Sequence, residues 1–222
     1  MRTLRLLSAL LSYPTAELVA ALPEIAERLG EDSALGGATQ DALAGLLAEL
    51  KRNDLLDLQE RYVAQFDAGR STSLHLFEHV HGDSRDRGQA MVDLNALYRR
   101  SGFVLAPNEL PDFLPAVLEY LANRPAEEAH ELLQDCAHIL RAVGERLISG
   151  GSPYAAVFAA LLDLQGEAPL KAVKHETLTK PLLDEEWEEM PVEFGPLSLA
   201  NSATSHGAQQ SRPQFIRFVP KR

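Results

Sequence analysis

Apolar residues recur at every third or fourth position along most of the first 166 residues, as they do on the buried face of an α-helix. The segments with this spacing are residues 4–11, 15–30, 43–50, 54–66, 74–80, 89–100, 114–121, 127–148 and 152–162. Clear strand-like alternation is missing from the sequence, and so are Asn-Gly hairpin turns. The pattern therefore predicts an all-α protein, a single-domain bundle of about eight or more helices with a flexible C-terminal tail.

Several predicted helix ends carry residues that cap helices. Thr15 and Asp54 each precede an apolar run, where a side-chain oxygen accepts a hydrogen bond from a free backbone N–H group. Gly30 is placed to end the second helix. Ser152 and Pro153 combine an expected N-cap with a proline at the first helical position. These residues predict where the second, fourth and last helices begin or end.

Two polar stretches interrupt the helical spacing in the middle of the chain. Residues 82–88 are bounded by glycines and predict a connection between helices, whereas residues 103–111 predict a loop. Glu109 and Asp112 lie just before the next predicted helix, where the helix dipole favours negative charge. Their simplest interpretation is a helix cap, and their functional interpretation is recognition of a basic peptide.

The composition changes after residue 166. Residues 1–168 are predicted to form the all-helical domain, and residues 169–222 are predicted to form a tail that is first acidic and then of low complexity. Residues 200–212 contain mostly Ser, Gln, Asn and Gly, which offer little to bury, so disorder is expected there. Residues 215–220 are apolar and basic, which suits docking on an acidic surface.

The charge balance narrows the classes of partner. With 21 Lys and Arg against 32 Asp and Glu in 222 residues, the formal net charge is −11. General nucleic-acid binding is disfavoured, because it needs a basic face that displaces counterions from phosphates. A basic peptide would be a suitable partner, although solubility alone also explains an acidic surface.

The cysteine count and the lengths of the apolar stretches indicate the compartment and whether the chain inserts into a membrane. The single cysteine, Cys136, excludes an intramolecular disulfide and a Cys-rich metal site, and its apolar surroundings predict a buried core residue. The lone cysteine fits a reducing compartment. Residues 1–12 are interpreted as a first core helix and not as a signal peptide. No uninterrupted apolar stretch approaches the roughly 18 residues of a membrane span, so direct membrane insertion is not expected.

The sharpest chemical pattern consists of His75, Glu78 and His79, which match the H-x-x-E-H arrangement of inverted zinc proteases. If all three lie on one helix, both imidazoles face the same way as zinc ligands and the carboxylate is placed as a general base. A zinc-dependent hydrolase is therefore one hypothesis. A half-buried helix whose histidines form hydrogen bonds is the plainer alternative, and a haem-binding or electron-transfer bundle is a third.

A dense run of charges follows this pattern. Its members are Asp83, Arg85, Asp86 and Arg87. A solvated loop with a helix cap explains them adequately. The functional alternative is a rim of paired charges around a groove that binds a peptide.

Four segments together are distinctive. They are YVAQFD at 62–67, SLHLFEHVHGDSRDRGQAMVDL at 73–94, NELPDFLP at 108–115 and LEYL at 118–121. They closely resemble the NarJ-type chaperones of respiratory nitrate reductase, within the wider TorD/DmsD group of redox-enzyme maturation proteins. The resemblance covers roughly residues 2–166, with a weaker likeness at 215–221.

This resemblance implies a cytoplasmic, all-helical chaperone with no catalysis and no cofactor of its own. The implied partner is the apo catalytic subunit of nitrate reductase, including its N-terminal segment, held competent for molybdenum cofactor insertion before membrane attachment. The residues implied to lie near the peptide groove are Tyr98, Gly102, Glu109, Pro111 and Asp112. A homodimer is left open.

Overall fold

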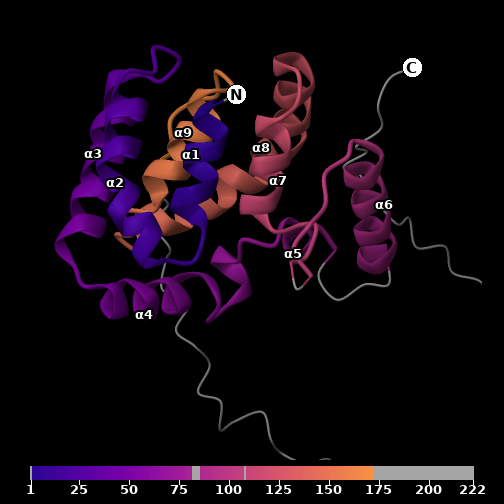
Figure 1. Cartoon of the computed structure of the whole chain (residues 1–222), viewed down its shortest axis with the longest axis horizontal. Coiled ribbons are helices and arrows are strands. Elements are labelled where there is room, and N and C mark those ends of the chain that lie inside the picture. The colour runs from indigo at the N-terminus through magenta and orange to yellow at the C-terminus, as the bar shows by residue number, and fades with distance from the viewer. Residues whose placement is uncertain (1, 82–85, 108, 173–222) are drawn as a thin grey trace, which may run out of the picture. The chain divides into compact units, whose positions relative to one another are not determined.

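The computed structural model describes residues 2–81, 86–107 and 109–172, and these residues are helical almost throughout (Figure 1). The helices are α1 (Arg2–Leu11), α2 (Ala16–Gly30), α3 (Gly37–Arg52), α4 (Leu55–Phe66), the short 3₁₀ helix η1 (Arg70–Thr72), α5 (Leu76–His81), α6 (Asp86–Arg100), α7 (Leu114–Ala122), α8 (Ala126–Ser149) and α9 (Ala155–Asp163). Within the described ranges the only β-type pairing is an isolated antiparallel bridge between His75 and Phe113. The predicted all-α fold is confirmed.

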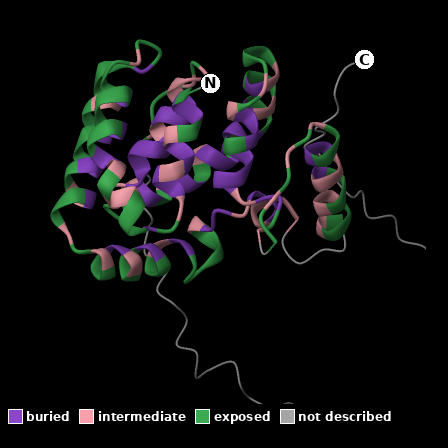
Figure 2. Ribbon diagram, in the orientation of Figure 1, coloured by how far each residue is buried: buried purple, intermediate pink, exposed green. Residues whose placement is uncertain are grey.

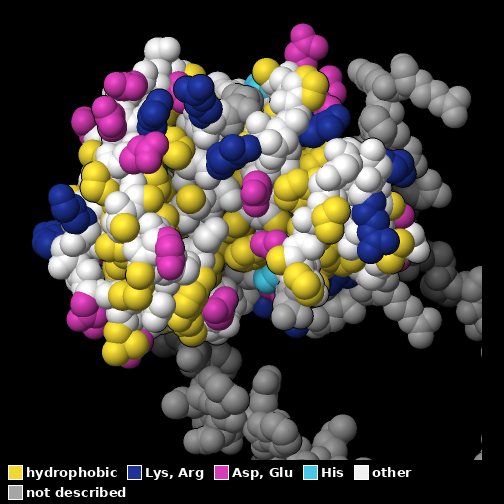
Figure 3. All heavy atoms as spheres, in the orientation of Figure 1, with side chains coloured by type: hydrophobic (Ala, Val, Ile, Leu, Met, Phe, Trp, Pro, Cys, Tyr) yellow, Lys and Arg dark blue, Asp and Glu magenta, His cyan; other side chains and the backbone are white. Residues whose placement is uncertain are grey.

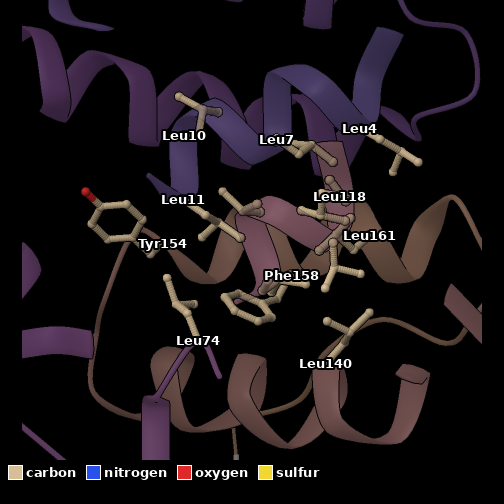
Figure 4. Close-up of a cluster of buried hydrophobic side chains, with 14 of the residues drawn as sticks. Leu4, Leu7, Leu10, Leu11, Leu74, Leu118, Leu140, Tyr154, Phe158 and Leu161 are labelled. Carbon is tan, nitrogen blue, oxygen red and sulfur yellow. The ribbon is translucent and has the colours of Figure 1, made fainter. Parts of the chain in front are cut away.

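The core lies around α1 and α9, which are buried along most of their length (Figure 2). Helix α1 packs on α7, and α9 packs on α3 and α8. Leu7, Leu118 and Phe158 come from three of these helices and point toward one another in the centre of the cluster (Figure 4). Helix α9 is apolar on all sides, as expected of a helix enclosed by others.

Two predicted caps are confirmed. The Thr15 side chain accepts a hydrogen bond from the Leu18 N–H at the start of α2. The Asp54 side chain accepts one from the Asp57 N–H at the start of α4, at 3.0 Å. Both side chains satisfy a backbone donor that the first helical turn leaves free.

Other predicted boundaries are wrong. Helix α9 begins at Ala155 and has no side-chain cap, because the chain passes through a turn in which the carbonyl of Ser152 accepts the Ala155 N–H. Helix α6 begins at Asp86, so Asp86, Arg87 and Gly88 belong to a helix and not to the expected connection. An acidic residue in the first turn favours this earlier start, since it complements the helix dipole.

The described chain stays packed beyond residue 168. Arg141 on α8 donates to the Ala168 carbonyl at 2.8 Å and forms an ion pair with Glu167 at 3.0 Å. Leu170 lies against Gly144, where an added Cβ would come within 2.7 Å of a Leu170 methyl group. The predictions of disorder at 200–212 and of docking by 215–220 fall outside the described residues.

Two predictions about burial and membrane contact can be compared with the fold. Cys136 is 2% exposed, and burial raises the pKa of its thiol to about 12. The expected core role of Cys136 is therefore confirmed. Across the described parts of the chain, no helix combines the length and apolar character that crossing a bilayer requires.

Candidate functional site

Asp112 lies at the centre of the candidate site and is completely buried. One carboxylate oxygen accepts the backbone N–H of Phe77 at 3.1 Å, and the other lies 3.1 Å from Nδ1 of His75. The backbone carbonyl of Asp112 also accepts the N–H of Leu76, at 3.0 Å. The expected cap on α7 is wrong, because Phe113 occupies the N-cap position and Asp112 turns inward to hold the start of α5.

His75 precedes α5 and bridges it to the segment before α7. Its backbone pairs with Phe113, and its ring lies 5.4 Å from the Phe113 ring. The hydrogen bond to Asp112 raises the pKa of His75 above its ordinary 6.5, against partial burial, which lowers it. The Asp112 carboxylate thus favours the protonated form of the imidazole, and the imidazole gives this buried group a partner, as a buried charge requires.

Arg87 on α6 completes this charge cluster. Its guanidinium forms an ion pair with Glu78 of α5 at 3.1 Å and approaches Asp112 at 4.0 Å. Partial burial raises the pKa of Glu78, but hydrogen bonds from Ser73 and Arg87 outweigh it, so the pKa lies below 4.5. Four of the predicted charged residues thus connect three chain segments that are distant in sequence.

Tyr98 holds the chain at Pro111, near the end of the loop that follows α6. The buried Tyr98 hydroxyl donates to the Pro111 carbonyl at 2.8 Å. The Tyr98 ring also packs on Phe103 and Tyr120, with ring centres 5.3 and 4.7 Å apart. Gly102 turns the chain out of α6 with a φ of +74°, a conformation that glycine adopts without strain. Tyr98 and Pro111 are buried, so neither offers its side chain to a partner.

The loop that follows α6 exposes apolar side chains and a partly exposed acidic one. We call the exposed part of this loop the rim; its members are Val104 (82% exposed), Leu110 (46%) and the half-buried Glu109. Val92 on α6 is also exposed, at 61%. Sequence reasoning found Glu109 but missed the three apolar residues. The signal for two of them was present: Val104 and Leu110 stand in a loop rich in proline and polar residues, where apolar side chains have no helix face to join.

The zinc hypothesis required a shared helix face that the structure does not provide. His75 lies outside α5, and its ring is held by Asp112. His79 donates from Nε2 to the Ser73 carbonyl at 2.9 Å. Among the described residues, no group of three His, Cys, Asp or Glu side chains is arranged to hold a metal ion.

The remaining charged candidates separate into two groups. Asp83 and Arg85 lie outside the described residues. Asp86 is exposed in the first turn of α6, next to the half-buried Arg87. Of the two described members of this run, Arg87 belongs to the cluster around Asp112.

Comparison with known proteins places this arrangement in a family. The family model described as "Nitrate reductase delta subunit" matches residues 17–160. The chain is 44% identical over 196 residues to the nitrate reductase molybdenum cofactor assembly chaperone NarJ of Escherichia coli strain K12, a match covering 85% of this chain and 83% of the relative. The chain belongs to the nitrate reductase delta subunit family.

Two further members show how far the likeness extends. The probable assembly chaperone NarW of the same E. coli strain is 42% identical over 203 residues, covering 87% of this chain and 84% of NarW. The probable NarJ of Bacillus subtilis strain 168 is 32% identical over 161 residues, covering 72% of this chain and 86% of the relative. The resemblance to NarJ-type chaperones is thereby confirmed. These relatives are named as assembly chaperones, and nothing among them supports a zinc hydrolase.

Proposed function

We propose that this chain is an assembly chaperone that binds the apo catalytic subunit of respiratory nitrate reductase, including its N-terminal segment. By holding that subunit it keeps the molybdenum cofactor site open to loading and delays membrane attachment. The proposal places this step in the cytoplasm, where the apo subunit is made. Family membership and the names of the relatives support the chaperone role.

The observation that carries the choice of site is the exposure of the rim's apolar side chains in a loop held by buried hydrogen bonds of Tyr98 and Asp112. Val104 and Leu110 are exposed although the loop beneath them is fixed by the Tyr98 hydroxyl and the Asp112 cluster. A prearranged apolar surface loses little conformational entropy when a peptide binds. An amphipathic segment that presents apolar residues at helical spacing is suited to such a surface.

Charge adds specificity to this apolar contact. Glu109 is half-buried beside Leu110, and the whole chain carries a net charge of −11. An acidic surface speeds the encounter with a basic segment and disfavours acidic ones. Asp112, which the sequence placed among the peptide-binding residues, is proposed to act as a positioning residue, because its carboxylate is enclosed by His75 and Phe77.

The test is calorimetric titration of the chain with a peptide of the first residues of the host's nitrate reductase catalytic subunit. Val104→Ser with Leu110→Ser is expected to weaken binding about tenfold, because exposed apolar anchors carry most of the binding free energy. Glu109→Gln is expected to weaken binding less at high salt than at low salt, because salt screens a partly exposed charge.

Glu119→Gln on α7 is the matched control for Glu109→Gln, since Glu119 is exposed and lies outside the rim. It should leave both the affinity and its salt dependence unchanged. The melting temperature of each variant shows whether the fold is intact. An unaltered peptide affinity in the Val104 and Leu110 double variant, with an unaltered melt, would contradict the assignment of the rim.

A further inference from the structure

A second apolar surface lies on helix α4, a helix well apart from α6 in Figure 1. Six large hydrophobic residues of the described chain are exposed. Two belong to the rim, Val92 lies on α6, and the other three are Tyr13 (46% exposed), Leu56 (65%) and Val63 (44%), which line one depression. The proposed function uses the rim only, so these three residues have no assigned role.

Helix α4 is apolar on two faces. Leu58, Tyr62 and Phe66 form the buried face that packs on the body. Leu56 and Val63 are seven residues apart, which places them two turns apart on the same outer face. A surface helix normally presents polar residues to water, so this second apolar face indicates a binding surface.

The outer face borders a depression of about 360 Å³. We call its lining the α4 surface; its members are Tyr13, Leu56, Gln59, Glu60, Val63 and Ala64. Two residues that line the depression are held by contacts with the body of the protein. The Gln59 amide donates to the Pro14 carbonyl at 2.9 Å, and the Tyr13 ring packs edge-on against the buried Tyr62 ring at 5.5 Å.

Ala64 connects this depression to a second one of about 250 Å³ on the other flank of α4. The small alanine side chain is exposed and lines both, so one bulky side chain crossing the helix at this point reaches both hollows. The second depression is lined by Tyr154 and by the ion pair of Arg61 with Glu49, whose charged atoms lie 3.0 Å apart. Helix α4 is therefore flanked by two adjacent hollows that share the Ala64 side chain.

Charge around the α4 surface is mostly negative. Helix α4 and its two flanking caps contain four acidic residues, namely Asp54, Asp57, Glu60 and Asp67. The single basic residue of this segment, Arg61, is paired with Glu49. Hydrophobic and acidic side chains lie side by side over α4 in Figure 3. A second copy of this chain would bring like charges together here, whereas a basic partner would be attracted.

We infer that the α4 surface is a docking site for a basic amphipathic helix of a partner protein. Apolar side chains at positions i, i+3 or i+4 and i+7 of that helix contact Leu56, Val63 and the hollows beside Ala64. Lysine or arginine residues at the edge of its apolar face lie opposite Asp57 and Glu60. This site is separate from the rim and does not depend on nitrate reductase being the client.

The test measures fluorescence anisotropy of two synthetic helical peptides of about 20 residues, a length at which such helices form in water. Both carry leucines at the stated spacing; one has lysines beside them and the other has glutamates. The full-length chain is expected to bind the lysine peptide about tenfold more tightly or better. Leu56→Ser with Val63→Ser is expected to reduce that affinity about tenfold.

A second variant tests the same surface without changing Leu56 or Val63. Ala64→Arg places a cation and a bulky side chain between the two hollows. It should reduce the affinity for the lysine peptide about as much as the Leu56 and Val63 double variant does. Ala20→Arg is its matched control, because Ala20 is also an exposed helical alanine, on α2, and lies outside the α4 surface. The control should bind the lysine peptide as the parent does.

Four results would overturn the inference. They are equal affinity for the two peptides, unchanged affinity in both α4 variants, a dimer of the parent that the α4 variants abolish, and displacement of the lysine peptide by a synthetic peptide of residues 213–222. The dimer would assign the surface to a second copy, and the displacement would assign it to this chain's own end. Because no nitrate reductase component is used, these results leave the proposed function untouched.

Discussion

At the scale of single residues, Asp112 connects three parts of the chain that are far apart in sequence. Its side chain accepts the Phe77 N–H and contacts His75, while its carbonyl accepts the Leu76 N–H. Arg87 brings α6 to the same carboxylate at 4.0 Å. A buried carboxylate with several donors is costly to remove, because each donor is left without a partner and without water.

Asp112→Ala is therefore expected to lower the free energy of unfolding by about 3 kcal/mol, as the loss of one partner of a buried charge pair does. Asp112→Asn should cost less, because its amide oxygen still accepts the Phe77 N–H. Urea unfolding measures both. Glu109→Gln is the control, since it changes a nearby acid outside the cluster; a loss as large as that of Asp112→Ala would contradict the assigned role of Asp112.

The raised pKa of His75 predicts the pH dependence of stability. A histidine whose pKa is higher in the folded than in the unfolded chain stabilises the fold fully below the unfolded value, here 6.5. That contribution is lost as the pH rises through the folded pKa. The parent should therefore be more stable than His75→Gln at pH 6, and the difference should shrink toward pH 9.

The measurement is the difference between the two free energies of unfolding as the pH is raised. Glu78 does not interfere in this range, because its lowered pKa changes stability only when the pH falls below 4.5. A difference that stays constant or grows with pH would exclude the His75 and Asp112 pair as its source.

At the scale of elements, the crossing of α8 and α9 depends on the absence of a side chain at one position. A Cβ on Gly144 would lie 2.9 Å from the Phe158 Cβ and 2.7 Å from a Leu170 methyl group. Phe158 is fully buried and cannot move aside as a flexible side-chain end can. The glycine thus allows α8 to approach α9 and the segment carrying Leu170.

Gly144→Ala is expected to lower stability by about 1–2 kcal/mol, because overpacking outweighs the better helix propensity of alanine. Combining it with Leu170→Ala should not restore stability, since the clash with Phe158 remains. Gly45→Ala on α3 is the matched control: nothing lies within 4 Å of its added Cβ, so it should stabilise by about 0.5–1 kcal/mol. Thermal and urea unfolding measure the stability of Gly144→Ala, of its combination with Leu170→Ala and of Gly45→Ala. A stabilising Gly144→Ala would refute the close approach of α8 to α9.

At the scale of the whole molecule, the described residues through 172 form a helical core that is closed by its own apolar contacts. Leu4, Leu140 and Leu161 are completely enclosed within it, and they come from α1, α8 and α9. This core contains residues from both ends of the described chain, so its stability is expected to be cooperative. For the residues after 172, the prediction that follows rests on the amino-acid sequence.

Truncation after Pro196 is expected to leave the melting temperature within a few degrees of the parent. The deleted part contains the polar residues 200–212, which have little apolar surface to bury. Differential scanning calorimetry measures the effect. A large loss of stability would show instead that the apolar residues in 215–219 pack into the folded body.

The sequence by itself determined the helices and most of their buried faces, because a period of about 3.6 residues is a local property of the chain. Thr15 and Asp54 were found for the same reason, since a cap acts on the N–H groups three residues away. The motif in residues 73–94 is also sufficient to indicate the family, which the family model then confirms. Local spacing and motif content were sufficient for these conclusions.

Only the tertiary structure decided what the charged residues do. The pattern at His75 looked like part of a helical metal site, but contact with Asp112, 37 residues later, holds its ring instead. Asp112 looked like a helix cap because its neighbours suggested one, and long-range burial turned it inward. The exposure of Leu56 and Val63 was likewise decided by which face of α4 the remaining helices cover. A side chain's burial and partners depend on segments distant in sequence, which local periodicity does not specify.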